Sequence, residues 1–431
     1  MQVSVEKTSE LSRKMTVSVP EAIVQEKMAA RLKTLAREVK VDGFRPGKAP
    51  QHVVKQMYGD RVRNEVAGDL IQSTYFEALQ NQDLKPAGYP HIQQAEDDSE
   101  GFKYTATFEI YPDISLEGLD ELSVVRPIAA IASSDIDAMV DKLRSQKKTW
   151  QTVDRVSQEN DRVTISFSGV SEGENFTDGK VEGYPVEIGG KQMIPGFEDN
   201  LTGLSVGSTK VFSLTFPEQY GNEKLAGKLA EFDIEVTGLE EAVLPEVNEE
   251  FIKAYGIEDG TIEAFMDDVK ANMERELNQA LRGKLKNAVM DALYEKVPIL
   301  LPNTLVDQEI ESMLKPYQET AKKQKMKLED LNLSRVVFEG QAKRRVALGL
   351  ILGEIIDKNS IKLDDSKVRL SIEDMAKSYE RPEDVINWYY AEEQRLSEVK
   401  QVVLEEQVVE WLVAKAKVSE QTMSFSEVMD K

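Results

Sequence analysis

The sequence predicts a multidomain α+β protein with an N-terminal α+β module, a small antiparallel-sheet domain and an all-helical C-terminal domain. The chain has 431 residues, more than a single hydrophobic core usually organises. Period-two apolar alternation marks the first quarter and the middle of the chain, and helix-period stripes mark the last part. We therefore expect an N-terminal module over 1–112, a connector over 113–150, a sheet domain over 151–242 and a helical domain over 243–431.

The N-terminal module is predicted to combine strands with two helices. Strands are indicated by alternation at Val3, Val5, Met15, Val17 and Val19, and again at Phe102, Tyr104, Ala106, Phe108 and Ile110. A helix is expected after Pro20, with one apolar stripe at Val24, Met28, Leu32, Leu35 and Val39. A second helix is expected from Val54, Met57, Val62, Val66, Leu70 and Leu79. Its pattern is less regular around Gly59.

The remaining segments differ sharply in periodicity. In the connector, 123–132 is strand-like, and Ser133-Ser134-Asp135 is expected to cap a helix whose Ile136, Val140 and Leu143 face inward. The middle domain shows short alternating runs separated by Gly and Pro, as an antiparallel sheet requires. From Phe265 to Leu293, apolar residues recur at a spacing of four, which predicts one long helix. Further helices are expected at 335–358, 366–378, 383–392 and 394–417.

The charge is distributed unevenly. The net charge is −23, which opposes nonspecific binding of nucleic acid by the molecule as a whole. Residues 1–112 nevertheless hold 15 Lys/Arg and 16 Asp/Glu, whereas the rest holds 39 and 61. Within 27–63 there are ten basic residues and three acidic ones. One basic patch therefore stands on an acidic protein.

Several function classes are disfavoured by the sequence. The absence of cysteine excludes disulfides and thiolate chemistry. No phosphate-binding loop, dinucleotide fingerprint or zinc-protease motif occurs, and the two histidines, His52 and His91, are too few for a multi-histidine metal site. We expect no cofactor. A signal peptide would need an apolar run near the start of the chain, but the first residues contain Glu6 and Glu10 and no such run. No apolar stretch is long enough for a membrane span. We expect a cytoplasmic protein that does not engage membranes.

The segment Gly43-Phe44-Arg45-Pro46-Gly47-Lys48-Ala49-Pro50 lies between the two predicted helices of the basic region. One interpretation is an ordinary turn, with Gly43 ending one helix, Pro50 starting the next, and Phe44 packing as a local plug. The other is an exposed docking tip, because Phe44 stands between Asp42 and Arg45. An aromatic side chain beside cations suits a surface that is partly apolar and partly anionic.

The pattern Gly-Phe-Arg-x-Gly-x-x-Pro in this segment resembles the ribosome-docking signature of the bacterial trigger factor family, and the order of modules is similar along the whole chain. The resemblance implies docking on the large ribosomal subunit near the exit tunnel, against protein and rRNA. It assigns contacts to Phe44, Arg45 and Lys48, and loop shape to Gly43 and Gly47. It also implies that nascent or unfolded polypeptides are partners, bound mainly by the helical domain, and that the free protein forms a homodimer.

The middle domain resembles the FK506-binding type of prolyl isomerase. The resemblance rests on the runs 163–169, 176–179, 193–198 and 216–221 and on Phe232. It assigns a proline pocket to Phe167, Phe176, Met193, Ile194, Phe197, Tyr220 and Phe232. Two positions depart from the family pattern: Phe197 stands where many members have Trp, and Thr177 stands where an acidic residue is expected.

An apolar pocket suits this chemistry, because rotation about an X–Pro bond needs neither a covalent step nor a proton transfer. The family resemblance thus implies a ribosome-associated, ATP-independent chaperone with peptidyl-prolyl cis–trans isomerase activity. The aromatic residues are also compatible with a plain sheet core. The alternatives are a peptide-binding chaperone or adaptor without significant isomerase turnover, a nucleic-acid adaptor using the basic patch, and a periplasmic chaperone-isomerase, which the lack of a signal sequence disfavours.

Overall fold

The structure is a computed structural model that describes residues 1–39, 44, 50–94, 101–177, 179–222, 224–324, 334–377, 379 and 381–430. It divides into two compact units. The first comprises Met1–Pro127 and Gly283–Gln421, and the second comprises Ile128–Arg282 and Thr422–Lys431. Helices and antiparallel sheets occur in the chain as expected, so the predicted α+β class is confirmed. Among the described residues, no helix combines the length and apolar character needed to cross a bilayer.

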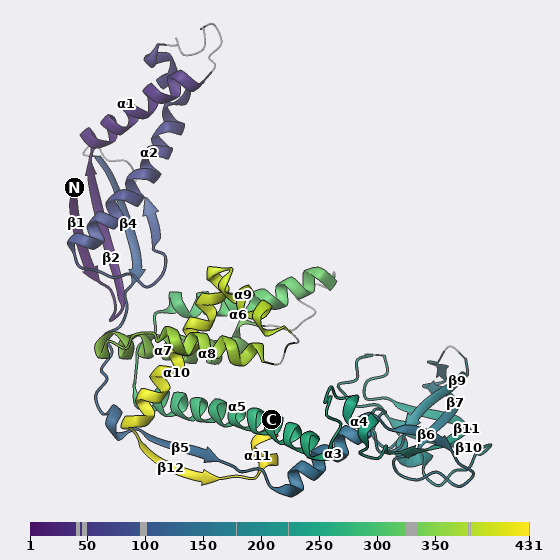
Figure 1. Cartoon of the computed structure of the whole chain (residues 1–431). Helices are drawn as coiled ribbons and strands as arrows, with labels where there is room; N and C mark the ends of the chain where they lie inside the picture. Colours follow the sequence, from purple (N-terminus) through teal and green to yellow (C-terminus); the bar gives the residue numbers. More distant parts are fainter. Residues whose placement is uncertain are drawn as a thin grey trace. The chain divides into compact units, whose positions relative to one another are not determined.

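The first unit contains a four-stranded antiparallel sheet in the order β1-β2-β4-β3 (Figure 1). Its strands are β1 Gln2–Lys7, β2 Ser12–Pro20, β3 His91–Gln94 and β4 Gly101–Glu109. Met15 pairs with Ala106 and Val17 with Tyr104 in the register of β2 and β4, and all four side chains are buried. The predicted alternation is therefore confirmed, and it places one face of the sheet in the core.

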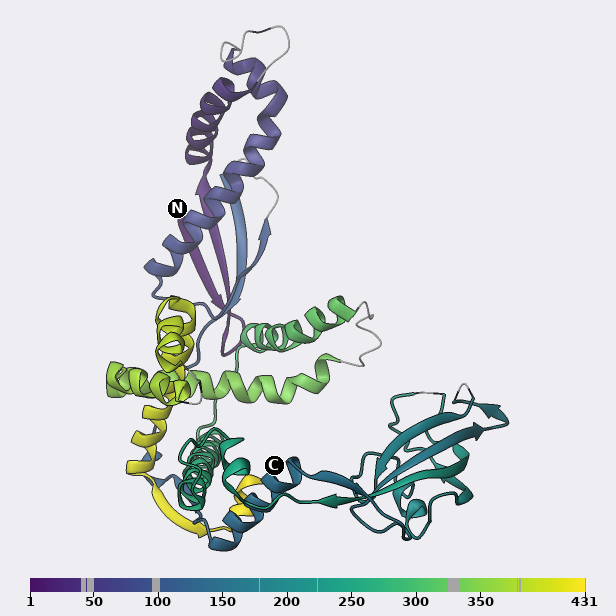
Figure 2. The ribbon, with the colours of Figure 1, turned by 45° about the vertical axis from the view of Figure 1, so that its right-hand side comes forward.

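Helices α1 Glu21–Glu38 and α2 Gln51–Asn81 lie side by side (Figure 2), and their apolar side chains share one core with this sheet. The predicted stripe of α1 is confirmed, with Val24, Met28 and Leu32 buried. The placement of Met57 in the apolar stripe of α2 is wrong, because 57% of this residue is exposed. The helix continues through Gly59, and its inward face runs at a spacing of four from Val54 through positions 58, 62, 66 and 70.

The rest of the first unit is mainly helical, as predicted. Its elements are η1 Leu119–Glu121, the part of α5 Ile262–Lys296 from Gly283 onward, α6 Asn303–Gln324, α7 Arg335–Asn359, α8 Asp365–Ala376, α9 Pro382–Tyr390 and α10 Glu393–Lys415. Val289 and Leu293 of α5 pack in one core with Ile351 of α7 and Leu412 of α10. The spacing of four in α5 predicted this apolar face.

Two contacts within the first unit link segments far apart in the sequence. The Glu109 carboxylate at the end of β4 accepts hydrogen bonds from the Thr304 backbone N–H, at 2.8 Å, and from the Thr304 hydroxyl, at 3.0 Å. It thereby caps the start of α6. Strand β12 Lys417–Thr422 pairs with β5 Ser123–Ile128. This strand was not expected in the helical domain, because its largely exposed residues show no apolar alternation.

The second unit contains a six-stranded sheet and a small helical cluster. The antiparallel sheet comprises β6 Thr149–Thr152, β7 Arg162–Ser171, β8 Glu174–Asn175, β9 Val181–Glu187, β10 Thr209–Thr215 and β11 Leu229–Val243. The short helix η2 Glu198–Leu201 contributes Leu201 to its core. The remaining helices are α3 Ser133–Gln146, α4 Glu249–Lys253, the early part of α5, and α11 Phe425–Met429. The predicted helix is present as α3, but it begins at Ser133 with Ala132 as its N-cap, so Ser133 and Ser134 lie in the first turn rather than at the cap. The Asp135 carboxylate caps the helix by accepting from the Ala132 N–H at 2.8 Å.

Candidate functional site

The residues predicted to line a proline pocket lie together on the sheet of the second unit. Phe197 and Phe232 form the base of this group, which we call the aromatic site. Phe197 is completely buried, Phe232 is 4% exposed, and their ring centroids are 5.2 Å apart at an interplanar angle of 87°. Edge-to-face contacts of this kind stabilise an aromatic core beyond the area they bury. The base is therefore closely packed and shielded from solvent.

Four further predicted residues surround this base and are only partly buried: Phe167, Phe176, Met193 and Ile194. The Phe167 ring contacts Phe197 at 6.3 Å between centroids, and the Phe176 ring contacts Phe232 at 5.7 Å. Their partial exposure means that solvent, or an apolar ligand, reaches these side chains. These four residues are the walls of the aromatic site.

Tyr220 is the seventh predicted residue, and it stands at the rim. It is 39% exposed, and its ring packs 4.6 Å from that of Phe216. The predicted set omitted Phe212 and Phe216, which contact Phe232 at 5.8 and 6.1 Å, and Tyr184, which contacts Phe167 at 5.8 Å. The alternation of Phe212 in β10 and Phe216 just after it could have indicated that both side chains face the core. Tyr184, next to Gly183 and Pro185, carries no periodic signal.

Gly169 determines how the Phe176 ring lies. A Cβ atom at position 169 would come within 2.2 Å of the ring carbon Cζ of Phe176, so only glycine leaves room for the ring. The Phe176 backbone N–H donates to the Gly169 carbonyl at 3.1 Å. Thr177 occupies the position where an acidic residue was expected, and its hydroxyl accepts a hydrogen bond from the Gly169 N–H at 3.1 Å. At this departure from the family pattern, Thr177 holds the backbone beside the aromatic site.

The wall formed by Met193 and Ile194 follows an irregular loop that one carboxylate organises. Glu198, 9% exposed, accepts hydrogen bonds from the backbone N–H groups of Gly189, Lys191, Gln192 and Met193. Burial raises the pKa of this carboxyl, but the four N–H donors outweigh burial and hold the pKa below its ordinary value. The Pro195-Gly196 turn, with Gly196 at φ +85°, then brings Phe197 beneath the loop.

The site thus offers an apolar, aromatic surface with one phenol hydroxyl at its rim. Such a surface removes water from a bound peptide group and favours the less polar, twisted form of an X–Pro amide over the planar form. The exposed Tyr220 side chain carries the phenol hydroxyl at this rim. The arrangement suits noncovalent catalysis of bond rotation.

The predicted docking tip is described only in part. Phe44 is 40% exposed, so it does not plug the core of the N-terminal module. Gly43, Arg45, Gly47 and Lys48 lie outside the described residues. The flanking helices hold much of the basic patch, and two of its arginines form ion pairs: Arg31 with Glu65 at 2.7 Å and Arg63 with Glu21 at 3.8 Å.

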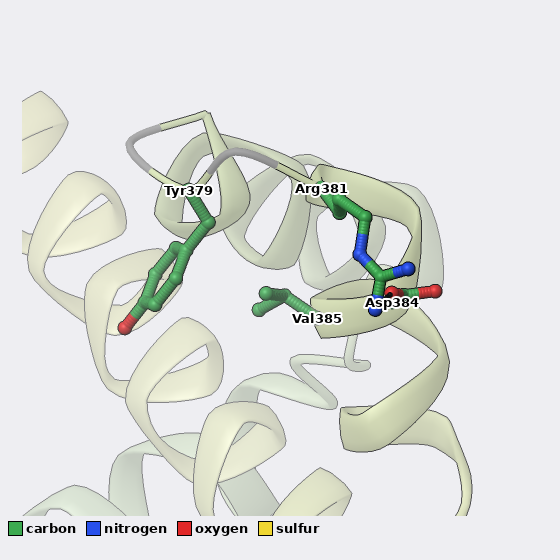
Figure 3. A pocket seen from close by; sticks show the side chains of 4 residues that line it. All are labelled: Tyr379, Arg381, Asp384 and Val385. Atoms are coloured by element: carbon green, nitrogen blue, oxygen red, sulfur yellow. Dashed lines mark ion pairs between the residues drawn. The ribbon is translucent and has the colours of Figure 1, made fainter.

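A shallow hollow marks the helical part of the first unit. It is lined by Tyr379, Arg381, Asp384 and Val385, and Figure 3 shows Arg381 beside Asp384 across from the Tyr379 ring. Arg381 and Asp384 form an exposed ion pair at 2.6 Å, and such surface pairs contribute little to stability. Nearby, the Arg395 guanidinium lies 4.0 Å from the centroid of the exposed Trp388 ring. This surface is open, mixed aromatic and charged.

The chain matches three models of known protein families. Residues 1–143 match the family model of the bacterial trigger factor protein, 261–414 match its C-terminal model, and 153–237 match the FKBP-type peptidyl-prolyl cis-trans isomerase model. The trigger factors of Pseudomonas syringae pv. syringae and Thioalkalivibrio sulfidiphilus are each 43% identical over 431 residues, covering 100% of this chain and 98% of theirs.

A solved structure of a trigger factor chaperone shares the fold. It has a TM-score of 0.51 and 16% identity, and the match covers 96% of this chain and 99% of that one. The FKBP-type match falls on the domain that carries the aromatic site, so this domain is a peptidyl-prolyl isomerase. The chain belongs to the bacterial trigger factor family of ribosome-associated folding chaperones with an isomerase domain.

Proposed function

We propose that the aromatic site binds X–Pro segments of unfolded polypeptides and catalyses their cis–trans isomerisation. The observation that carries this proposal is the arrangement of four partly buried apolar side chains, Phe167, Phe176, Met193 and Ile194, around the buried rings of Phe197 and Phe232. A proline ring fits against the base, and the preceding amide lies along the walls. Tyr220 donates to a substrate carbonyl at the rim.

The energetics require no chemistry beyond binding. Rotation about a peptide bond meets a barrier of roughly 18–20 kcal/mol, set by partial double-bond character. Preferential binding of the twisted amide that lowers this barrier by about 4 kcal/mol accelerates rotation about a thousandfold. Uncatalysed proline isomerisation takes tens of seconds. An isomerase held beside a growing chain therefore removes a slow folding step without ATP or a cofactor.

Docking on the ribosome is assigned to the tip around Phe44. Its exposed ring supplies an apolar contact, and Arg45 and Lys48 supply cations for rRNA phosphates and acidic protein groups. Gly43 and Gly47 shape the loop. We place this contact on the large subunit near the exit tunnel, and we place the protein in the cytoplasm, where nascent chains emerge.

Client binding is assigned to the helical region. Several of its helices carry exposed apolar residues, among them Val336, Val337, Leu370, Trp388 and Val402. Apolar side chains without a covering partner suit reversible capture of unfolded segments. The same surfaces would hold two copies together when the protein is free of ribosomes. The proposed modules are 1–112 for docking, 113–150 as connector, 151–242 for isomerisation and 243–431 for client binding.

The proposal is tested by measuring cis–trans isomerisation of an X–Pro tetrapeptide with the full-length chain. We expect saturable acceleration that Phe176→Ala lowers at least tenfold. Wild-type protein that binds the peptide without accelerating rotation would support the alternative, a peptide-binding chaperone or adaptor without significant turnover. That alternative is not favoured, because residues 153–237 match an isomerase family.

A further inference from the structure

Glu198 holds an unusual number of backbone contacts for one side chain. Oε2 accepts from the N–H groups of Gly189 and Lys191, both at 3.0 Å. Oε1 accepts from those of Gln192 at 2.9 Å and Met193 at 3.1 Å. Of the amides from 189 to 193, the remaining one, Gly190, donates to the Glu187 carbonyl at 3.2 Å. The carboxylate therefore serves a loop that has no strand partner of its own.

The loop backbone is built to surround an anion. Gly189 and Lys191 have left-handed φ angles of +88° and +53°, and left-handed residues within a turn can bring neighbouring N–H groups to the same side of the backbone. In this protein the anion is the chain's own Glu198, largely shielded from water. Without it, four N–H groups would lose their acceptor, and the loop would have to move to find new ones.

The position of Glu198 in the sequence links this loop to the aromatic site. Glu198 directly follows Phe197, which is completely buried at the base of the site. Its donors end at Met193, and Met193 and Ile194 form one wall. A hydrogen bond from the Phe197 N–H to the Ile194 carbonyl, at 3.0 Å, closes the turn between wall and base. The carboxylate thus fixes the distance between the wall formed by Met193 and Ile194 and the base formed by Phe197. A proline ring would fit between the two.

We propose that Glu198 is a positioning residue of the isomerase, which holds Met193 and Ile194 at the correct height above Phe197 through its backbone hydrogen bonds. This inference rests on the proposed function of the aromatic site. Glu198 has no role in touching the substrate. Its effect is to reduce the motion of one wall, so that the twisted amide meets a preformed surface.

The test compares Glu198→Gln with two references in the full-length chain. Glutamine keeps the shape of the side chain but replaces one acceptor oxygen with an NH₂ donor. Two of the four backbone N–H groups of the loop would then lose their acceptor and meet another donor. Leu239→Ala is the structural control, because Leu239 is buried in β11 seven residues beyond Phe232 and outside the aromatic site. Phe176→Ala reports on the site itself. Each variant is assayed for kcat and KM on an X–Pro peptide and for amide hydrogen exchange.

We expect Glu198→Gln to speed exchange at residues 189–193 selectively and to lower kcat/KM about tenfold, mostly through kcat. Leu239→Ala should accelerate exchange throughout the sheet while leaving kcat/KM of the folded protein within about twofold. Should Glu198→Gln not fold, Glu198→Asp, which keeps the charge on a shorter arm, is expected to show an intermediate loss. A tenfold loss of kcat/KM corresponds to about 1.4 kcal/mol of transition-state stabilisation.

Two results would overturn the proposal. One is rapid loop exchange with kcat/KM unchanged, and the other is an equal loss of kcat/KM in Leu239→Ala. Failure of the underlying function is distinguishable from both, because Phe176→Ala would then also retain full activity. If Phe176→Ala is inactive and Glu198→Gln is fully active, only the positioning role of Glu198 is wrong.

Discussion

The ring of Phe197 meets the ring of Phe232 edge to face, with centroids 5.2 Å apart. Both side chains are at least 96% buried, so this contact belongs to the sheet core as well as to the aromatic site. Truncating a buried phenylalanine typically costs about 3–5 kcal/mol. A substitution at either position would therefore perturb the fold and the site together. Substitutions at the partly buried wall residues affect the fold less and so report more directly on the site.

The fit of Phe176 over Gly169 gives the first prediction. Gly169→Ala places a methyl group where the Phe176 ring lies, so we expect the ring to turn away and the domain to lose about 1–3 kcal/mol. Isomerase kcat/KM should fall at least tenfold. Gly238→Ala on β11 is the matched control, because its Cβ would meet Thr164 at an ordinary 3.4 Å. Equal activity of the two variants would contradict the role of Phe176 as a wall.

Tyr220 offers a milder change. Tyr220→Phe removes the hydroxyl but keeps the ring that packs 4.6 Å from Phe216. One hydrogen bond to the substrate carbonyl is worth about 0.5–1.5 kcal/mol, so kcat/KM should fall about two- to tenfold, with the urea midpoint unchanged. The measurement is peptide isomerisation beside urea unfolding. An unaltered kcat/KM would mean that the hydroxyl does not bind substrate.

The second unit should lose stability on acidification. Burial raises the pKa of the Glu198 and Asp161 carboxyls, but their hydrogen bonds outweigh it and hold both pKa values below the ordinary range. Asp161 accepts from Arg155 and from the Gln158 N–H. Because these pKa values are lower in the folded state, the unfolded chain binds protons more readily than the folded one. The resulting contribution to the free energy of unfolding is complete above the ordinary carboxyl pKa and is lost as the pH falls through the pKa values of the folded state.

Urea unfolding followed at pH 7 and below about pH 4, where ordinary carboxyls titrate, measures this effect. The midpoint of the second unit should fall with pH in the wild type, and Glu198→Gln should reduce the slope because its amide does not titrate. Parallel pH profiles for the two proteins would show that Glu198 does not contribute to the pH dependence of stability.

The aromatic site could be predicted from the sequence only where a motif marked it. Turn residues around Ile194, Phe197 and Tyr220 identified these side chains through family resemblance. Alternation from Phe212 in β10 to Phe216 just after it indicated that both side chains face the core, but it could not indicate that they contact a site. The role of Glu198 left no pattern, because its partners lie in a loop without periodicity and a glutamate in an acidic chain carries no signal.

The fold was predicted well where apolar periodicity was strong, as in α5. Met57 was misplaced because spacings of three and four are both compatible with a helix, and only packing showed that the face passes through position 58. Strand β12 was missed because its pairing partner, β5, lies nearly three hundred residues earlier. Pairing over such a distance leaves no local pattern.

The docking tip gives a prediction independent of catalysis. Reversing charge at Arg45 and Lys48 should abolish co-sedimentation with ribosomes while isomerase activity persists, because phosphate contacts dominate such binding. Reversal at Lys253 and Lys270, exposed lysines of the second unit, changes the net charge equally and should leave co-sedimentation intact. Unchanged binding of the Arg45 and Lys48 variant would refute the assignment.

The most direct test of the account is the isomerase activity of full-length wild type and Phe176→Ala, assayed side by side with capture of an unfolded client. We predict that Phe176→Ala stays folded, loses at least tenfold in kcat/KM, and captures the client as well as the wild type does. Full isomerase activity in a folded Phe176→Ala protein would contradict the assignment of the aromatic site.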